Sequence, residues 1–78
     1  MSDGYYEKGK ISIELKEGVS VEEIRSIIEG FGLSVIRADL WGVVVVVPDG
    51  QESEFVQIFD KIHKLVDKAY LYLKEGTL

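Results

Sequence analysis

The chain has 78 residues, a formal net charge of −5 and no cysteine, and 46% of its residues are hydrophobic. A chain of this length forms one domain, and without cysteine neither disulfides nor thiolate metal sites can stabilise it. The acidic balance argues against nucleic acid, which proteins bind largely through Lys and Arg contacts to phosphate, and against an anionic membrane surface. The longest apolar run, 43–47, is far shorter than the roughly 18 residues of a membrane span.

The first half of the chain predicts a strand, a helix and a second strand. Residues 1–9 are polar with no clear period, and we expect a flexible N-terminal tail there. Residues 10–16 alternate strictly between apolar and polar side chains, which predicts a half-buried strand. Ser20 and Glu23 fit a capping box at the start of a helix. A second strand is expected over 33–39.

After a short turn, the second half of the chain again predicts a strand, a helix and a strand. Gly42 is a candidate for a positive-φ position in the turn, and the valines at 43–47 predict a strand that is apolar on both faces. Apolar residues at helical spacing predict a second helix over about 52–66. A last alternating segment predicts a strand over 69–74.

The order strand, helix, strand, strand, helix, strand predicts an α+β fold of the ferredoxin-like βαββαβ type. Right-handed crossovers place both helices on one face of a four-stranded antiparallel sheet. The first and third strands are then central, and the second and fourth are edges. We expect this domain to cover 10–75, with 76–78 as a C-terminal tail.

The sheet face away from the helices is the candidate functional surface. A face that meets only water is expected to be polar, but this one is predicted to carry Val44, Val46, Tyr70 and Tyr72. One interpretation is a protein-binding surface. The other is that β-branched residues simply favour strands. RNA binding is not expected, because the central third strand carries valines rather than aromatic residues.

Three segments resemble the propeptides of subtilisin-like serine proteases. The run ISIELKEGVS at 11–20 resembles their first strand and helix start, and GVVVVVP at 42–48 resembles their third strand. The run IHKLVDKAYL at 62–71 is similar to their last helix end and last strand. The resemblance covers roughly 10–75 and implies the same βαββαβ fold.

The resemblance also implies a function, that of an intramolecular chaperone and tight inhibitor of a cognate protease. In that family the open sheet face packs on two surface helices of the protease, and the residues after the last strand lie in the substrate cleft. Carried over, the face residues are Val44, Val46, Tyr70 and Tyr72, and the cleft residues are Glu75, Gly76, Thr77 and Leu78. A terminal leucine suits an apolar specificity pocket, whereas Glu75 stands where that family often has an apolar residue.

No constellation of residues predicts catalysis, a cofactor or a metal site. The only histidine, His63, is predicted on the polar side of the second helix. The acidic pairs at 22–23 and at 52 and 54 fall in first turns of helices, where they favour the helix dipole. Trp41, at a turn, is either a partner anchor or a lid on the core. We therefore expect a protein that is not an enzyme.

Two other functions remain open for this fold. One is a small-ligand regulatory domain of the amino-acid-sensing kind, with its site at loop 16–19, and the other is a homodimerisation module in which two open faces pair. The first ten residues hold no apolar signal core. We expect secretion if the chain is an excised propeptide and a cytoplasmic location otherwise.

Overall fold

The computed structural model describes residues 6–73 and confirms the predicted α+β fold. Its elements are β1 (Tyr6–Leu15), α1 (Val21–Gly30), β2 (Ser34–Ala38), β3 (Gly42–Val46), α2 (Glu52–Asp60) and β4 (Val66–Leu73). The strands form one antiparallel sheet in the order β2-β3-β1-β4. As predicted, β1 and β3 are central and β2 and β4 are edges. Residues of the predicted tails at 1–5 and 76–78 lie outside the described residues.

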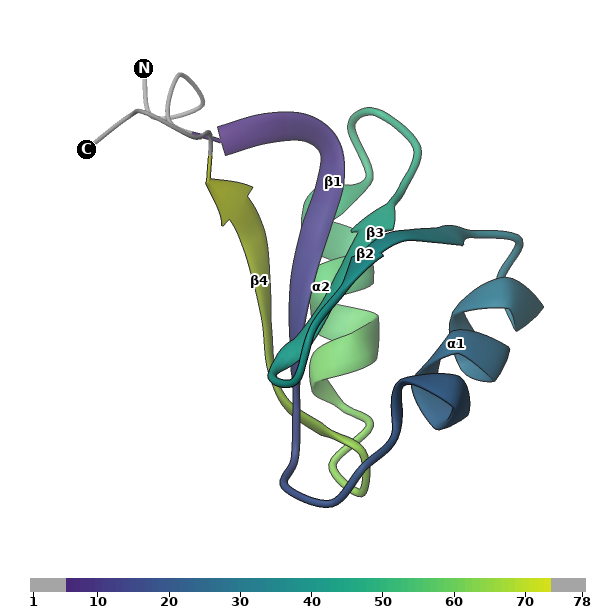
Figure 1. Cartoon of the computed structure of the whole chain (residues 1–78). Coiled ribbons are helices and arrows are strands. Elements are labelled where there is room, and N and C mark those ends of the chain that lie inside the picture. The colour runs from purple at the N-terminus through teal and green to yellow at the C-terminus, as the bar shows by residue number, and fades with distance from the viewer. Residues whose placement is uncertain (1–5, 74–78) are drawn as a thin grey trace.

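Both helices lie on the same side of the sheet (Figure 1), and the core fills the space between the two layers. In the sheet, Ile11 lies opposite Val45 and Leu71, and Ile13 lies opposite Val43 and Ala69. The buried core contains Ile11, Ile13, Ile24, Ile28, Leu33, Val43, Val45, Val47, Phe59, Val66 and Ala69. Each fully buried large side chain stabilises the fold by about 1.5–3 kcal/mol, which is how so small a domain folds without disulfides.

The start of α1 has the predicted capping box. The Ser20 hydroxyl accepts a hydrogen bond from the Glu23 backbone N–H, and the Glu23 carboxylate accepts one from the Ser20 N–H at 3.0 Å. These two bonds satisfy backbone donors that a helix start otherwise leaves without partners.

Several element boundaries differ from the prediction, and the first is the start of β1. β1 begins at Tyr6, so residues 6–9 belong to the sheet and not to a tail. Gly9, with φ of 79°, provides the bend that lets the strand continue, and beyond it Tyr6 pairs with Leu73 of β4. The sequence did not predict this part of the strand for two reasons. Its residues are mostly polar, and the bend at Gly9 interrupts the alternation of apolar and polar side chains.

The second helix is shorter than predicted, since α2 ends at Asp60. Ile62 and Leu65 continue the helical spacing but lie in a turn, where both pack against the core. Val66 already belongs to β4 (Val66–Leu73), so this strand begins before the predicted residue 69, and its predicted last residue, 74, lies outside the described residues. Apolar spacing alone does not distinguish a helix from a turn that covers the same core.

Gly42 was predicted to adopt a positive φ in the turn, and this prediction is wrong, since its φ is not positive. The position needs glycine for a different reason. It pairs with Glu14 of β1, and a Cβ built on it would overlap the carbonyl group of Ile13. The absence of a side chain therefore lets β3 approach β1 at the start of the strand.

Candidate protein-binding face

The four predicted face residues all lie on the open side of the sheet. Ser12 of β1 is opposite Val44 on one side and Tyr70 on the other, which places these three side chains in one row. In the next row Lys10 is opposite Val46, and the Lys10 Nζ lies 5.8 Å from the centre of the Tyr72 ring. The sheet thus brings the two valines and the two tyrosines together around β1.

The two valines differ in accessibility. Val46 is 39% exposed, whereas Val44 is only 8% exposed although it is not part of the helix-side core. Arg37 of β2 lies opposite Val44, and together with Trp41 and Tyr70 both residues line a small cavity of about 100 Å³ on this face. Val44 therefore packs against the side chains around it and offers little surface to a partner. Val46 offers the larger accessible surface.

Tyr70 is held in place by polar neighbours. Its hydroxyl donates a hydrogen bond of 2.9 Å to Glu14 Oε2, and the Lys68 Nζ lies 5.9 Å from the centre of its ring. Burial, and then the hydrogen bond to Glu14, raises the pKa of Tyr70 above its ordinary value of 10.0. The phenol is therefore neutral at physiological pH and remains a hydrogen-bond donor.

The turn between β2 and β3 exposes two large apolar side chains, Leu40 at 93% and Trp41 at 77%. Asp39 fixes this turn, because its Oδ1 accepts hydrogen bonds from the N–H groups of Trp41 at 2.8 Å and Gly42 at 2.9 Å. Trp41 lines the open-face cavity beside Tyr70, so it is not a lid on the core. Sequence reasoning overlooked Leu40, although an apolar pair in a turn that starts with aspartate was a usable signal.

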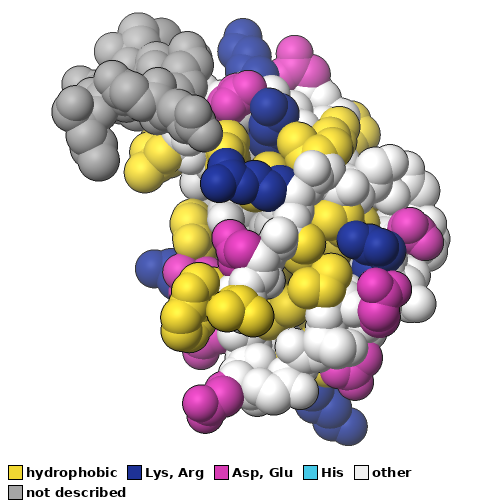
Figure 2. All heavy atoms as spheres, viewed as in Figure 1, with side chains coloured by type: hydrophobic (Ala, Val, Ile, Leu, Met, Phe, Trp, Pro, Cys, Tyr) yellow, Lys and Arg dark blue, Asp and Glu magenta, His cyan; other side chains and the backbone are white. Residues whose placement is uncertain are grey.

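The open face is a mixed surface. In the view of Figure 2, hydrophobic side chains lie among scattered Lys, Arg and acidic side chains. Such a pattern suits recognition of a protein surface, where an apolar centre supplies affinity and surrounding charges fix the orientation.

Other predicted site residues lie away from this face or outside the described chain. His63 is exposed in the turn after α2 and not on the helix. Among residues 6–73, no three His, Asp or Glu side chains gather closely enough to hold a metal ion. Neither described helix has the length and apolarity to cross a membrane. The predicted cleft residues 75–78 lie outside the described residues.

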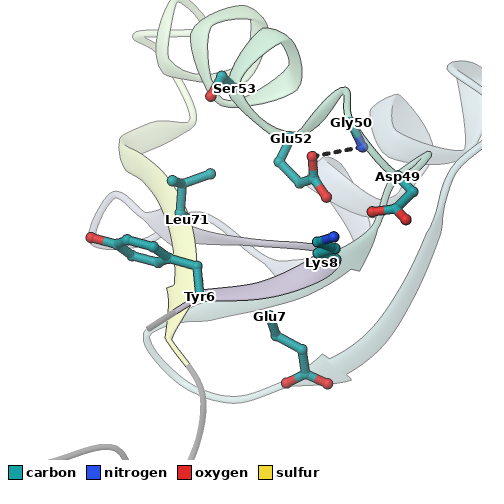
Figure 3. Close-up of a pocket in the computed structure, with 8 residues that line it drawn as sticks. All are labelled: Tyr6, Glu7, Lys8, Asp49, Gly50, Glu52, Ser53 and Leu71. Atoms are coloured by element: carbon teal, nitrogen blue, oxygen red, sulfur yellow. Dashed lines mark hydrogen bonds between the residues drawn. The ribbon is translucent and has the colours of Figure 1, made fainter. Parts of the chain in front are cut away.

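A separate cavity of about 440 Å³ lies at the start of α2 (Figure 3). It is lined by Tyr6, Glu7, Lys8, Asp49, Gly50, Glu52, Ser53 and Leu71. The loop 16–19, where a regulatory ligand was considered, lines neither this cavity nor the one on the open face.

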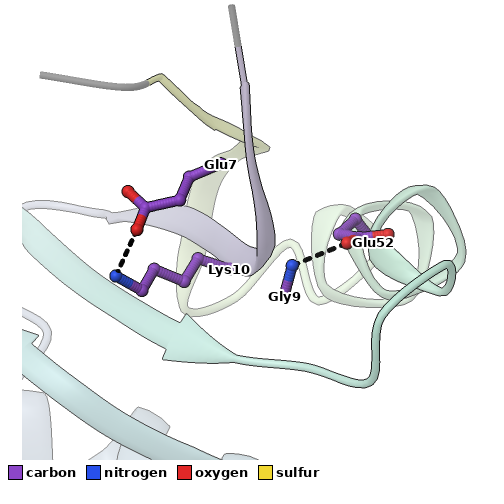
Figure 4. Close-up of polar contacts among 4 residues, drawn as sticks. All are labelled: Glu7, Gly9, Lys10 and Glu52. Carbon is purple, nitrogen blue, oxygen red and sulfur yellow. Dashed lines mark hydrogen bonds and ion pairs between the residues drawn. The ribbon is translucent and has the colours of Figure 1, made fainter. Parts of the chain in front are cut away.

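Glu52 connects the bend in β1 to the start of α2. Its Oε2 accepts a hydrogen bond of 2.7 Å from the Gly9 N–H (Figure 4), and its Oε1 accepts one of 2.9 Å from the Gly50 N–H. Close by, the Lys10 Nζ pairs with the Glu7 carboxylate at 2.7 Å. The bond to Gly9, with other backbone bonds, holds the pKa of Glu52 below 4.5.

Glu52→Gln is expected to lower the free energy of unfolding at neutral pH by about 1 kcal/mol, since a neutral amide accepts these bonds less well. Because folding lowers the pKa, the charged form stabilises the fold above pH 4.5, and this contribution disappears as the pH falls further. Urea unfolding followed by circular dichroism from pH 7 to about pH 3 checks this. Glu54→Gln, also in the first turn, is the control; equal pH profiles for the two variants would contradict the linkage.

The comparisons with known proteins give no relative. No family model matches the chain, and neither does any curated protein or solved structure.

Proposed function

We propose that this chain is a non-enzymatic protein-binding domain that docks its open sheet face on a partner. The observation that carries the proposal is the gathering of Val46, Tyr70 and Tyr72 on the side of the sheet away from both helices. A sheet face that served only to meet water would be polar.

The chemistry of this face suits a protein partner. Tyrosine and tryptophan contribute strongly to protein interfaces, because they combine a large apolar surface with one polar group. Trp41 extends the face at one end, and the turn that carries it is fixed by Asp39. Lys10, Glu14 and Lys68 surround the tyrosines with both signs of charge, which favours a partner with a matching pattern.

The partner class that we propose is a subtilisin-like serine protease, which the domain inhibits and helps to fold. This rests on the resemblance of 11–20, 42–48 and 62–71 to propeptides of that class, and on the open face that such propeptides use. The residues proposed for the substrate cleft are Glu75, Gly76, Thr77 and Leu78.

Titration of the full chain against several subtilisin-type proteases tests the proposal. We expect inhibition at micromolar domain or below, and Val46→Lys should weaken it by about tenfold or more, because a lysine replaces an exposed apolar contact. Ser26→Lys is the matched control, since it makes the same charge change at an exposed position of α1. No inhibition of any tested enzyme would overturn the protease assignment.

The same assay tests the cleft segment. Removal of Thr77 and Leu78 should weaken inhibition while leaving far-UV circular dichroism unchanged. Unchanged potency would reject the cleft role and leave the open face as the only contact.

A second candidate is self-association through the same face. The high exposure of Leu40 and Trp41 favours it, because exposed apolar groups at a rigid turn suit a symmetric contact. Sedimentation equilibrium separates the two functions. A dimer that Val46→Lys converts to a monomer would assign the face to a second copy, whereas a monomer that binds protease supports the first proposal.

A further inference from the structure

β4 is an edge strand, and within residues 6–73 no hydrogen bond is found to the outward backbone groups in one part of its edge. The Ala69 N–H donates to Asp60 Oδ1 at 3.2 Å, so it points away from β1. Backbone groups of successive residues in a strand point to opposite sides. Tyr70 therefore pairs with Ser12 of β1, and the N–H and C=O of Leu71 point outward.

Asp60 limits where another strand can pair. It occupies the outward N–H of Ala69, so an added strand could bond only the C=O of Ala69 there, as charged groups on edge strands commonly limit pairing. Leu71 is the next residue of β4 whose backbone groups point outward. An added strand would therefore align with Leu71 rather than with the start of β4.

A groove of about 490 Å³ runs beside this part of β4, between the strand and α2. Val56 and Gln57 of α2 line one wall, and Ala69, Leu71 and Leu73 of β4 line the other. Residues directly opposite each other in an antiparallel pair have their side chains on the same face. The side chain of a residue paired with Leu71 would therefore enter this groove.

The groove continues into the cavity at the start of α2, with which it shares Tyr6, Ser53 and Leu71. The cavity carries a small excess of acidic groups, since Asp49 and Glu52 line it beside a single lysine, Lys8 (Figure 3), whereas the Glu7 carboxylate is paired with Lys10. The whole chain is also acidic, with a net charge of −5. An apolar groove that ends in a negative cavity suits an occupant with apolar side chains followed by a basic one.

We propose that the β4 edge binds an extended peptide segment of a partner as an additional antiparallel strand. Two apolar side chains at alternate positions occupy the groove, and an arginine or lysine two positions before the first of them occupies the acidic cavity. Antiparallel pairing starts the peptide at the cavity, because β4 runs from Lys68 toward Leu73 and the cavity lies beside Leu71 and Tyr6. This recognition mode combines backbone hydrogen bonds for affinity with side-chain pockets for specificity.

Fluorescence polarisation with a labelled acetyl-Arg-Thr-Val-Thr-Val-Thr-amide peptide tests the proposal on the full chain. We expect saturable binding, and N-methylation of the first valine should abolish it, because that amide faces β4. N-methylation of the threonine between the valines should preserve binding, since that amide points away from β4. Equal effects of the two methyl groups, or no saturation up to about 1 mM peptide, would overturn the proposal.

Asp49→Lys tests the basic end of the peptide. Asp49 is exposed, so the variant should fold, and we expect it to bind the arginine peptide about threefold or more weakly. A peptide with glutamate in place of arginine should regain affinity for this variant. If Asp49→Lys lowers the affinity for the arginine peptide but the glutamate peptide does not bind the variant more tightly, the proposed contact between the basic residue and the acidic cavity is wrong.

Hydrogen exchange distinguishes this edge from the open face. Bound peptide should slow exchange of the Leu71 amide but leave the Tyr70 amide unchanged, because Tyr70 is already bonded to β1. Val46→Lys, on the open face, should leave peptide binding intact. Protection of Leu71 by a second copy of the chain without peptide would instead assign the edge to self-association and overturn the peptide proposal.

Discussion

Phe59→Ala is expected to lower the free energy of unfolding by about 3–5 kcal/mol, the usual cost of a cavity left by a buried phenylalanine. Phe59 is fully buried between α2 and the sheet, and its ring lies 5.5 Å from that of Phe31 and 6.2 Å from that of Phe55. The net stability of so small a domain, after the conformational entropy lost on folding, is only about 3–5 kcal/mol. The variant should therefore be largely unfolded at room temperature.

Thermal and urea unfolding followed by circular dichroism measure this effect. Phe31→Ala is the matched control, because Phe31 belongs to the same aromatic cluster but is 48% exposed. It should lose only about 1 kcal/mol, in proportion to the smaller apolar area removed from water. Equal losses for the two variants would show that Phe59 is not the centre of the core.

Gly42→Ala is expected to destabilise the domain by about 1–3 kcal/mol or more, the range for side chains forced into a packed site. The added methyl group would overlap the Ile13 carbonyl, so β3 and β1 must separate where the open face is formed. Binding through Trp41, the neighbour of Gly42, should weaken together with stability.

Gly30→Ala provides a control of opposite sign. Gly30 is the last residue of α1, its φ is not positive, and a Cβ there meets no atom within 4 Å. Alanine favours helix by about 0.5–1 kcal/mol over glycine, so this variant should be slightly more stable than the wild-type chain. If both variants lose stability equally in urea unfolding, close approach at Gly42 is not the cause.

The fold was largely predictable because most of its signals are local. Alternation around Ile11 and Ile13 identified a central strand, and Ser20 with Glu23 identified a helix start. These signals depend on neighbours a few residues away. The bend at Gly9 was not predictable in the same way, because its hydrogen-bond partner Glu52 is 43 residues distant along the chain. No local pattern in either segment predicts this contact.

The candidate face was predictable in part. Strand parity alone placed Tyr70 and Tyr72 on one side, and the sheet register confirms that they share it with Val44 and Val46. Arg37 lies opposite Val44 because β2 is irregular between Val35 and Arg37, and no local pattern in the sequence predicts this irregularity. The groove beside β4 requires the packing of α2 on the sheet, which no local pattern specifies.

The pairing of Tyr6 with Leu73 has a mechanical consequence. β1 and β4 are antiparallel neighbours, and these two residues form the last described pair at one end of their shared ladder. A pulling force applied to the two ends of the described chain would load the hydrogen bonds of this ladder one after another. The sheet would then open like a zipper at low force, instead of shearing all its bonds together.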